Sequence, residues 1–191
     1  MGFEHVSLAL LHYPVYDREG RVVATALTTI DVHDLARLAR TYAMGPFFVI
    51  TPLRSQQELG LRMVRYWTEG PGANYNPTRK EALRLVHFVD SLEDAVGGLK
   101  ERWGQVPRTV ATSAKRWPQS TDYGEMARRI AEEEVPFLIL LGTGWGLSEE
   151  VVLKADFRLE RIEGWGYNHL SVRTAAAIIV DRLLGLGRYG R

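Results

Sequence analysis

Cysteine is absent from the sequence of 191 residues, and so is any long apolar run. Without cysteine the chain has neither a disulfide framework nor thiol ligands for a metal, which is typical of a reducing compartment. No apolar run approaches the roughly 20 residues that cross a bilayer. The first residues, MGFEH, lack the basic head and long apolar body of a signal peptide. We therefore expect a cytoplasmic protein with no membrane segment.

An excess of charge of either sign is also missing, because 24 Lys and Arg residues stand against 23 Asp and Glu residues. The five histidines have no metal-ligand spacing such as H-x-x-x-H, so we expect no bound metal. Internal repeats and interdomain linkers are absent as well. With 46% hydrophobic and 25% charged residues, the composition is that of a globular protein, and the length predicts one domain over residues 1–191.

Cations and aromatic residues gather in one part of the chain, residues 54–84. Guanidinium groups pair with phosphate and aromatic rings stack on bases, so such a mixture suits a nucleic-acid surface. A solvated helix face beside core aromatics explains the same pattern, and both interpretations stay open at this point. The residues concerned are Arg54, Arg62, Arg65, Tyr66, Trp67, Tyr75, Arg79, Lys80 and Arg84.

A glycine-rich loop follows the most apolar segment. The five apolar residues 137–141 predict a strand buried on both faces, as in parallel sheets. Gly142, Gly144 and Gly146 come directly after it. Because glycine has no Cβ, such a loop turns tightly and admits a ligand close to the backbone. Ser148 is the expected N-cap of a short helix behind the loop.

Strands and helices alternate along the whole chain. Periodicity of 3.6 residues predicts helices between short apolar runs, and this alternation is typical of an α/β fold with a mostly parallel sheet flanked by helices. Asp31 or Asp34 is the expected N-cap of the first helix. The segment 69–77, EGPGANYNP, is predicted to be a mobile loop. Strands are expected at 6–11, 47–50, 86–89, 109–112 and 137–141, and 21–27 is either a further strand or the return arm of a hairpin.

The last part of the chain adds a short strand, a second loop and an apolar helix. Residues 155–162 predict the strand, and 163–169, EGWGYNH, form a loop with two glycines. Ser171 is the expected N-cap of the helix. Three alanines, 175–177, allow another backbone or subunit to pack closely against it.

The order of these elements disfavours a Rossmann-type site. Strand, GxGxG loop and helix, with Glu160 eighteen residues after Gly142, superficially mimic the dinucleotide-binding fingerprint. That fold needs several further strands after its fingerprint, whereas about 45 residues follow the glycine loop here. We therefore expect a fold whose ligand loop comes late in the chain.

Two late segments resemble motifs of the SPOUT (trefoil-knot) RNA methyltransferases. Residues 138–150, LILLGTGWGLSEE, resemble the second motif, which is an apolar strand, G-x-E-x-x-G-[LI] and an acidic helix start. Trp145 stands in place of the acidic residue. Residues 168–177, NHLSVRTAAA, are similar to the third motif, L-N-V-S-V-A-A-A, with His169 where the asparagine is expected.

The first motif of the same family, N-P-x-N-x-G-A-x-x-R-T, resembles residues 31–41, DVHDLARLART. Arg40 and Thr41 match, while Asp31 and Asp34 replace the two asparagines. The strings HYPVYD, NPTRK and GTGWGL are also similar to a smaller branch of the superfamily, which in some bacteria is fused to the tRNA guanine-N1 methyltransferase. The resemblance thus covers nearly the whole chain.

The resemblance implies a C-terminal deep trefoil knot, in which the last helix passes through the loop that carries Gly142. It implies S-adenosyl-methionine bound between the loops 112–115, 142–146 and 162–171, mainly by backbone groups. It also implies an obligate homodimer, with the RNA (tRNA rather than rRNA) at the interface. The residues assigned to the cofactor are Thr112, Ser113, Leu141, Gly142, Gly144, Gly146, Ile162, Gly164, Asn168 and Leu170.

The resemblance makes Arg40 the expected catalytic residue. A ribose 2′-hydroxyl must lose a proton while it takes up a methyl group, so a group close to that hydroxyl is needed. Asp34, Ser171 and His169 are the further expected catalytic residues. A surface arginine paired with a neighbouring carboxylate, and a serine that only caps its helix, are the structural alternatives for Arg40 and Ser171.

The expected function is therefore 2′-O-methylation of tRNA with S-adenosyl-methionine as methyl donor. Base (N-) methylation by the same fold is one alternative. A non-catalytic RNA-binding knot module is another, since both asparagines of the first motif are replaced. A small-molecule methyltransferase is weakly supported by the near-zero net charge.

Overall fold

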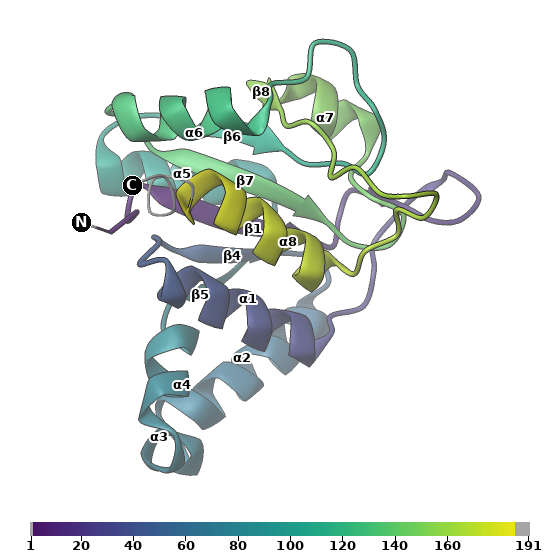
Figure 1. The fold of residues 1–191 in the computed structure, drawn as a ribbon. Coiled ribbons are helices and arrows are strands. Elements are labelled where there is room, and N and C mark those ends of the chain that lie inside the picture. The colour runs from purple at the N-terminus through teal and green to yellow at the C-terminus, as the bar shows by residue number, and fades with distance from the viewer. Residues whose placement is uncertain (1, 186–191) are drawn as a thin grey trace.

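A computed structural model describes residues 2–185 of the chain and contains a six-stranded parallel sheet (Figure 1). The strand order is β5-β4-β1-β7-β6-β8. The parallel α/β architecture expected from the alternating pattern is thereby confirmed. The strands are β1 (Val6–Leu11), β4 (Phe47–Ile50), β5 (Val86–Val89), β6 (Arg108–Ala111), β7 (Phe137–Gly142) and β8 (Phe157–Arg158).

The first strand lies in the centre of the sheet. β1 pairs with β4 on one side and with β7 on the other, in a register that places Val6 opposite Phe137 and Leu11 opposite Gly142. All six residues of β1 are buried, because helices cover both faces of the sheet. The predominantly apolar sequences of β1 and β7 follow from this position.

Two layers of helices cover the sheet. On one face α1 (Thr29–Thr41), α6 (Tyr123–Glu132) and α8 (Val172–Val180) pack against the even-numbered residues of β1. On the other face α5 (Leu92–Trp103) and α7 (Glu149–Lys154) pack against Ala9 and Leu11. Figure 1 shows α8 and α1 side by side, and the two helices are in contact. The first and third motifs therefore meet on one face of the sheet.

The segment expected to be a mobile loop contains a helix instead. After α2 (Arg54–Thr68), residues Pro71–Tyr75 form α3 and Pro77–Leu83 form α4. Each short helix has proline at its start, where the missing N–H is not needed. Asn76 then caps α4 by accepting a hydrogen bond of 3.0 Å from the N–H of Arg79. The Gly- and Pro-rich composition thus marks helix starts here.

Serine caps are predicted correctly, and the cap of α1 is not. Ser148 and Ser171 cap α7 and α8, and Ser91 forms a capping box with Asp94 at the start of α5. The helix α1 begins three residues before the expected position, with Thr28 as its N-cap. Asp31 consequently lies in the first turn of α1, and its carboxylate faces α8 rather than its own backbone.

Two small features complete the fold around the glycine loop. The segment 21–27 is the return arm of a hairpin, in which only β3 (Val22–Val23) is a strand and pairs with β2 (Val15–Tyr16). The expected strand over 155–162 contains only two residues, β8. From β8 the chain returns toward α8, and a π-helix at Asp181–Gly185 is the last element of the described residues. The loops after β6, β7 and β8 are thereby brought together.

Candidate active site

A large cleft lies at the carboxyl ends of β1, β6 and β7. Its volume is about 1590 Å³. Ligand pockets for small molecules are usually about 300–1,000 Å³, so this cleft is large enough for a cofactor-sized molecule with room beside it. Parallel sheets commonly bind ligands at this edge, because several loops converge there. The three loops expected from the sequence, after β6, after β7 and before α8, all contribute to its wall.

The glycines after β7 shape their own loop. A Cβ on Gly142 would lie 2.5 Å from the backbone nitrogen of Leu147, so only glycine lets the loop fold back here. Gly144 has a φ of +58°, and a Cβ there would lie 2.8 Å from the carbonyl oxygen of Tyr16. The space that Gly144 leaves open is thus taken by Tyr16, whereas the sequence had suggested a bound ligand there.

The N-terminal hairpin (residues 13–26) holds this glycine loop by backbone hydrogen bonds. The N–H of Trp145 donates to the carbonyl of Tyr16, and the N–H of Tyr16 donates to the carbonyl of Gly146, both at 2.9 Å. The N–H of Ser148 donates to the carbonyl of Pro14 at 3.2 Å. The loop therefore has a fixed shape that depends on the first strands of the chain.

Nine of the ten residues expected to contact the cofactor line the cleft. They are Thr112, Ser113, Leu141, Gly142, Gly144, Gly146, Ile162, Asn168 and Leu170. Gly164 does not line the cleft. A Cβ at Gly164 would lie 2.2 Å from the carbonyl oxygen of Tyr167, so the loop 163–169 needs glycine at this position for its own folding.

The wall of the cleft combines apolar and polar groups in a way that fits S-adenosyl-methionine. Leu141, Ile162 and Leu170 offer apolar surface for an adenine ring, and Leu170 is 41% exposed. Ser113 and Asn168 offer hydroxyl and amide groups for a ribose and an amino-acid tail. Asn168 is oriented by donating a hydrogen bond of 3.4 Å to the carbonyl of Ala114. The residues present therefore fit the cofactor.

An arginine from α8 and two carboxylates from α1 meet at the cleft. The Nε of Arg173 lies 3.1 Å from Asp31, and its Nη1 lies 3.6 Å from Asp34. Arg173 and Asp31 line the cleft, whereas Asp34 does not. Burial raises the pKa of the Asp31 carboxyl, Arg173 lowers it and Asp34 raises it, with a net increase. Asp31 is therefore a better proton acceptor than an ordinary aspartate.

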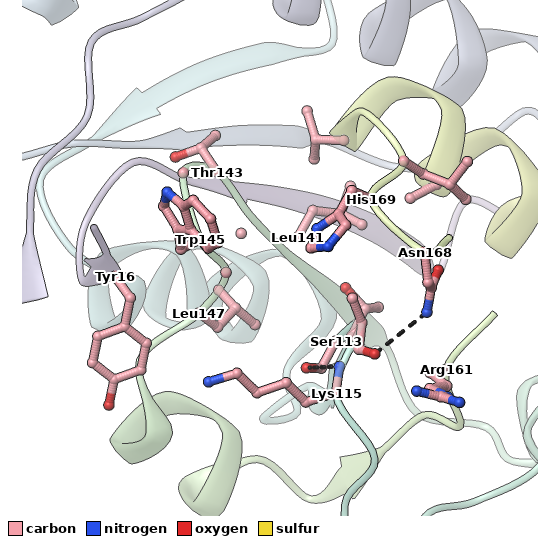
Figure 2. A pocket seen from close by; sticks show the side chains of 18 of the residues that line it. Tyr16, Ser113, Lys115, Leu141, Thr143, Trp145, Leu147, Arg161, Asn168 and His169 are labelled. Carbon is pink, nitrogen blue, oxygen red and sulfur yellow. Dashed lines mark hydrogen bonds between the residues drawn. The ribbon is translucent and has the colours of Figure 1, made fainter. Parts of the chain in front are cut away.

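His169 and Ser171, two of the residues expected to be catalytic, also line the cleft. His169 lies between Trp145 and Asn168 in Figure 2. The hydroxyl of Ser171 accepts the N–H of Thr174 at 3.2 Å, so this side chain caps α8. Capping orients the serine hydroxyl at the start of α8, beside the cleft.

Arg40 lies outside the cleft. It is located nine residues after Asp31 on the same helix, which is about 13 Å along the axis of α1. Its Nη2 forms an ion pair of 3.1 Å with Glu81 of α4, and both side chains are half exposed. Together with Arg37 and Arg79 it lines a second, smaller pocket of about 260 Å³ between α1 and α4. The guanidinium of Arg79 lies 4.3 Å above the ring of Trp67.

A buried histidine at the end of β1 also lines the cleft. The hydroxyl of Thr143 donates to the carbonyl of Leu11 and contacts the hydroxyl of Thr25. The hydroxyl of Thr25 is also hydrogen-bonded to Nδ1 of His12, at 2.9 Å. The Nε2 of His12 has no hydrogen-bond partner among residues 2–185. Burial lowers the pKa of His12 to about 4.

We expect this histidine to make the stability of the protein depend on pH. Between the unfolded pKa of about 6.5 and the folded pKa of about 4, the unfolded chain binds a proton that the folded chain does not. The free energy of unfolding therefore falls as the pH drops through this range, by up to about 1.4 kcal/mol per pH unit. Denaturant unfolding of the wild type and His12→Asn from pH 7.5 to 4.5 measures the difference, since the asparagine amide can still form a hydrogen bond with Thr25. A difference that is constant with pH would contradict the lowered pKa.

Neither a metal site nor a membrane-spanning helix is found in the described part of the chain. Among residues 2–185, no three His, Asp or Glu side chains come together as a metal site. Within the same residues, no helix has both the length and the apolar character needed to cross a membrane.

Several residues of the cleft were missed by sequence reasoning. Arg173 lies inside the third-motif segment 168–177 but matches no residue of the motif, and its partners lie about 140 residues away along the chain. Lys115 belongs to no motif. His12 and Thr25 are 13 residues apart, and they come into contact only because the hairpin between them folds back. The string HYPVYD, residues 12–17, was the sequence feature nearest to them. Its similarity to a branch of the superfamily did not indicate which side chains face the cleft.

Comparison with known proteins finds similarity along nearly the whole chain. A model of a family described as SAM-dependent RNA methyltransferase matches residues 5–185. A tRNA (guanine-N(1)-)-methyltransferase of Oleidesulfovibrio alaskensis is 47% identical over 178 residues, which are 93% of this chain and 41% of that protein. The chain thus spans about two fifths of the length of this relative.

Solved structures show the same fold. A TrmH/SpoU tRNA modifying enzyme of A. aeolicus has a TM-score of 0.57 at 16% identity, with 98% of this chain and 80% of that chain covered. A structure described as giving insights into the 2-OH methylation of C/U34 on tRNA has a TM-score of 0.58 at 18% identity, with 98% of this chain and 100% of that chain covered. These likenesses confirm the fold class expected from the three motifs.

Proposed function

This chain belongs to the family of SAM-dependent RNA methyltransferases, and from that premise we propose that it methylates a ribose 2′-oxygen of tRNA. The observation that carries the proposal is the cleft itself. It combines the loops that fit the cofactor with a carboxylate of raised pKa and a histidine, His169, in one continuous space. A proton acceptor beside the donor of the methyl group is what alkylation of a hydroxyl requires.

The residues of the chain have separable tasks in this proposal. The cofactor supplies a methyl group on a sulfonium centre, and the loops 112–115, 142–146 and 162–171 orient it. Asp31 or His169 takes up the proton of the acceptor hydroxyl, and Arg173 keeps Asp31 in place through its contact of 3.1 Å. Ser171 contacts the ribose while it caps α8. Asp34 holds Arg173 from the other side, at 3.6 Å.

The pocket between α1 and α4 is proposed to contact the RNA backbone. Arg37, Arg40 and Arg79 line it, and Glu81, which pairs with Arg40 at 3.1 Å, is the carboxylate that an RNA phosphate would have to replace. Arginine side chains pair with phosphate through two parallel hydrogen bonds, which makes a cluster of three suitable for a nucleic-acid backbone. The cation-rich part of the sequence, residues 54–84, contributes Arg79 to this surface.

Arg40 is proposed to serve the cleft of a second copy. Within one chain it lies about 13 Å along α1 from the cleft residue Asp31, so the catalytic role that the motif gives it requires a homodimer. The interface is proposed to include α8 and the first motif. Thr174 and Ala177 are small, exposed side chains on α8, and they allow close approach of a second copy.

We expect the protein to be a dimer in solution. Light scattering at micromolar concentration should give twice the mass of the chain. A monomer at that concentration would contradict the assignment of Arg40 to the cleft of a second copy.

The experiment that tests the function is methyl transfer from labelled cofactor into total RNA, followed by nucleoside analysis. The proposal expects label in tRNA, as a 2′-O-methylated nucleoside. Label on a base would favour base methylation, and the 47% identity to a tRNA (guanine-N(1)-)-methyltransferase makes this a specific alternative. RNA binding with no transfer into any RNA would favour the non-catalytic module.

A further inference from the structure

Aromatic side chains are left exposed where the two glycine loops meet at the cleft. Trp145 is 56% exposed, Tyr167 is 72% exposed and Trp165 is fully exposed. Large aromatic side chains are usually buried, and clusters of exposed ones mark binding surfaces. These three belong to the loops 143–147 and 163–170, so their exposure is concentrated at one place of the surface.

Three rings form a connected group at this place. The ring centroid of His169 lies 6.3 Å from that of Trp145 and 5.4 Å from that of Tyr167. The ring planes are inclined by 67° and 66°, so no ring covers the whole face of its neighbour. Trp145 and His169 line the cleft, while Tyr167 contacts His169 from outside it. Flat aromatic surface is therefore available to a ligand inside the cleft.

A cation without a carboxylate partner accompanies these rings. Lys115 lines the cleft, and in Figure 2 its side chain reaches toward Tyr16, which lies at the same end of the cleft as Trp145. Its Nζ lies 5.5 Å from the ring centroid of Tyr16, and it forms no ion pair within residues 2–185. A phosphate group is a natural counter-charge for a lysine in this position.

We propose that Trp145 and His169, supported by Tyr167, form a stacking platform for one unpaired base of the acceptor RNA, with Lys115 on an adjoining phosphate. This inference rests on the proposed function and adds its substrate class. A base inside a duplex has both faces covered by its neighbours, so a ring platform selects a nucleotide from a loop or single strand.

The adenine of the cofactor is the other flat ring that could occupy the platform. Asn168, a side chain that fits the ribose or the amino-acid tail of the cofactor, lies away from Trp145 in Figure 2, with His169 and Leu141 between them. Gly144 and Gly146, which flank Trp145, offer the cofactor backbone groups only, so the ring of Trp145 is left for another ligand. Space for a nucleotide remains at the end of the cleft where Trp145 lies, since the cleft is larger than a usual small-molecule pocket. The platform is thus assigned to the RNA.

The test compares Trp145→Ala with Trp165→Ala, two exposed tryptophans on neighbouring loops of which only the first lines the cleft. The probe is a fluorescently labelled single-stranded oligoribonucleotide, alone and paired with its complement. We expect the wild type to prefer the single strand. Trp145→Ala should bind it about 10- to 100-fold more weakly, Trp145→Phe should retain most of the affinity, and Trp165→Ala should equal the wild type.

Three further measurements separate the platform from other roles of Trp145. Calorimetry with S-adenosyl-homocysteine should give the same affinity for wild type and Trp145→Ala, and a parallel loss would assign the ring to the cofactor. Light scattering should give the same mass, and a change would assign the ring to the dimer interface. In methyl transfer, the KM for RNA should rise more than kcat falls.

The inference is wrong if Trp145→Ala binds the single strand as the wild type does, or if the wild type binds the duplex equally well. It is also wrong if Trp165→Ala loses as much affinity as Trp145→Ala. If the wild type transfers no methyl group but shows the expected pattern of RNA binding, the proposed function is wrong and the stacking platform is supported.

Discussion

Gly144→Val should abolish cofactor binding. The added Cβ would lie 2.8 Å from the carbonyl oxygen of Tyr16 and 3.3 Å from the Cγ2 of Thr25, so the glycine loop and the hairpin must separate. The φ of +58° is also unfavourable for a β-branched residue, which adds about 1–3 kcal/mol of strain. Calorimetry with S-adenosyl-homocysteine should show at least a hundredfold loss of affinity, and thermal unfolding should shift to a lower temperature.

Gly104→Val is the matched control for this substitution. Gly104 has a φ of +70° at the end of α5, and a Cβ there would meet nothing within 4 Å. The control should therefore lose a similar amount of stability through backbone strain and keep its cofactor affinity. Unchanged affinity in Gly144→Val would place the cofactor elsewhere, and equal loss in both variants would mean that binding simply follows stability.

Arg40→Ala should slow methyl transfer by about a hundredfold or more. The arginine is proposed to act on the acceptor hydroxyl and its phosphate, so its removal takes away a contribution to the transition state. Cofactor affinity should hardly change, because Arg40 is proposed to face the acceptor RNA and not the cofactor. RNA affinity should fall modestly, with a shallower dependence on salt, since one phosphate contact is lost.

Two other substitutions distinguish catalysis from simple charge. Arg40→Lys should restore little activity, because lysine lacks the planar fork that holds two groups together. Arg37→Ala removes a neighbouring arginine of the same pocket and should weaken RNA binding without changing the rate at saturating RNA. Transfer at the wild-type rate by Arg40→Ala would contradict a catalytic role for Arg40 and leave activation of the hydroxyl to Asp31, Asp34 and His169.

Mixing two inactive proteins tests whether the arginine acts across the dimer. The Arg40→Ala chain keeps an intact cleft, and the Gly144→Val chain keeps an intact Arg40. A mixed dimer would contain one cleft with a working cofactor loop and a partner's arginine, so part of the activity should return. Activity that stays absent although mixed dimers form would contradict the exchange of Arg40 between copies.

Much of the sheet could be predicted because its signal is local. The observed bounds of β1, β4 and β5 equal the predicted ones, since each is a mostly apolar run between polar segments. The two-residue strands have no such run: β2 and β3 pair with each other across a hairpin, and β8 exists only through pairing with the distant β6. The helix α3 was missed because glycine and proline usually mark loops, whereas here proline begins the helix.

The candidate site could be predicted only in part, for a similar reason. Three motifs and the ends of three strands located the loops that form the cleft. The contact of Gly144 with Tyr16 and the contact of Asp31 with Arg173 join residues more than 120 positions apart, and one sequence contains no sign of either. A motif also does not say on which side of a helix its arginine lies, so the distance of Arg40 from the cleft became evident only in three dimensions.

The central place of β1 has a consequence for how the protein is made. Its neighbour β7 begins 131 residues later, with Phe137 opposite Val6. At about 5–20 residues per second, a ribosome needs roughly 7 to 26 seconds to reach β7. During that time the edge of β1 that pairs with β7 has no partner from its own chain, and contacts between such distant residues form slowly. Newly made chains therefore pass through an interval in which this edge of a largely apolar strand is open to aggregation and to chaperones, until β7 emerges and pairs with it.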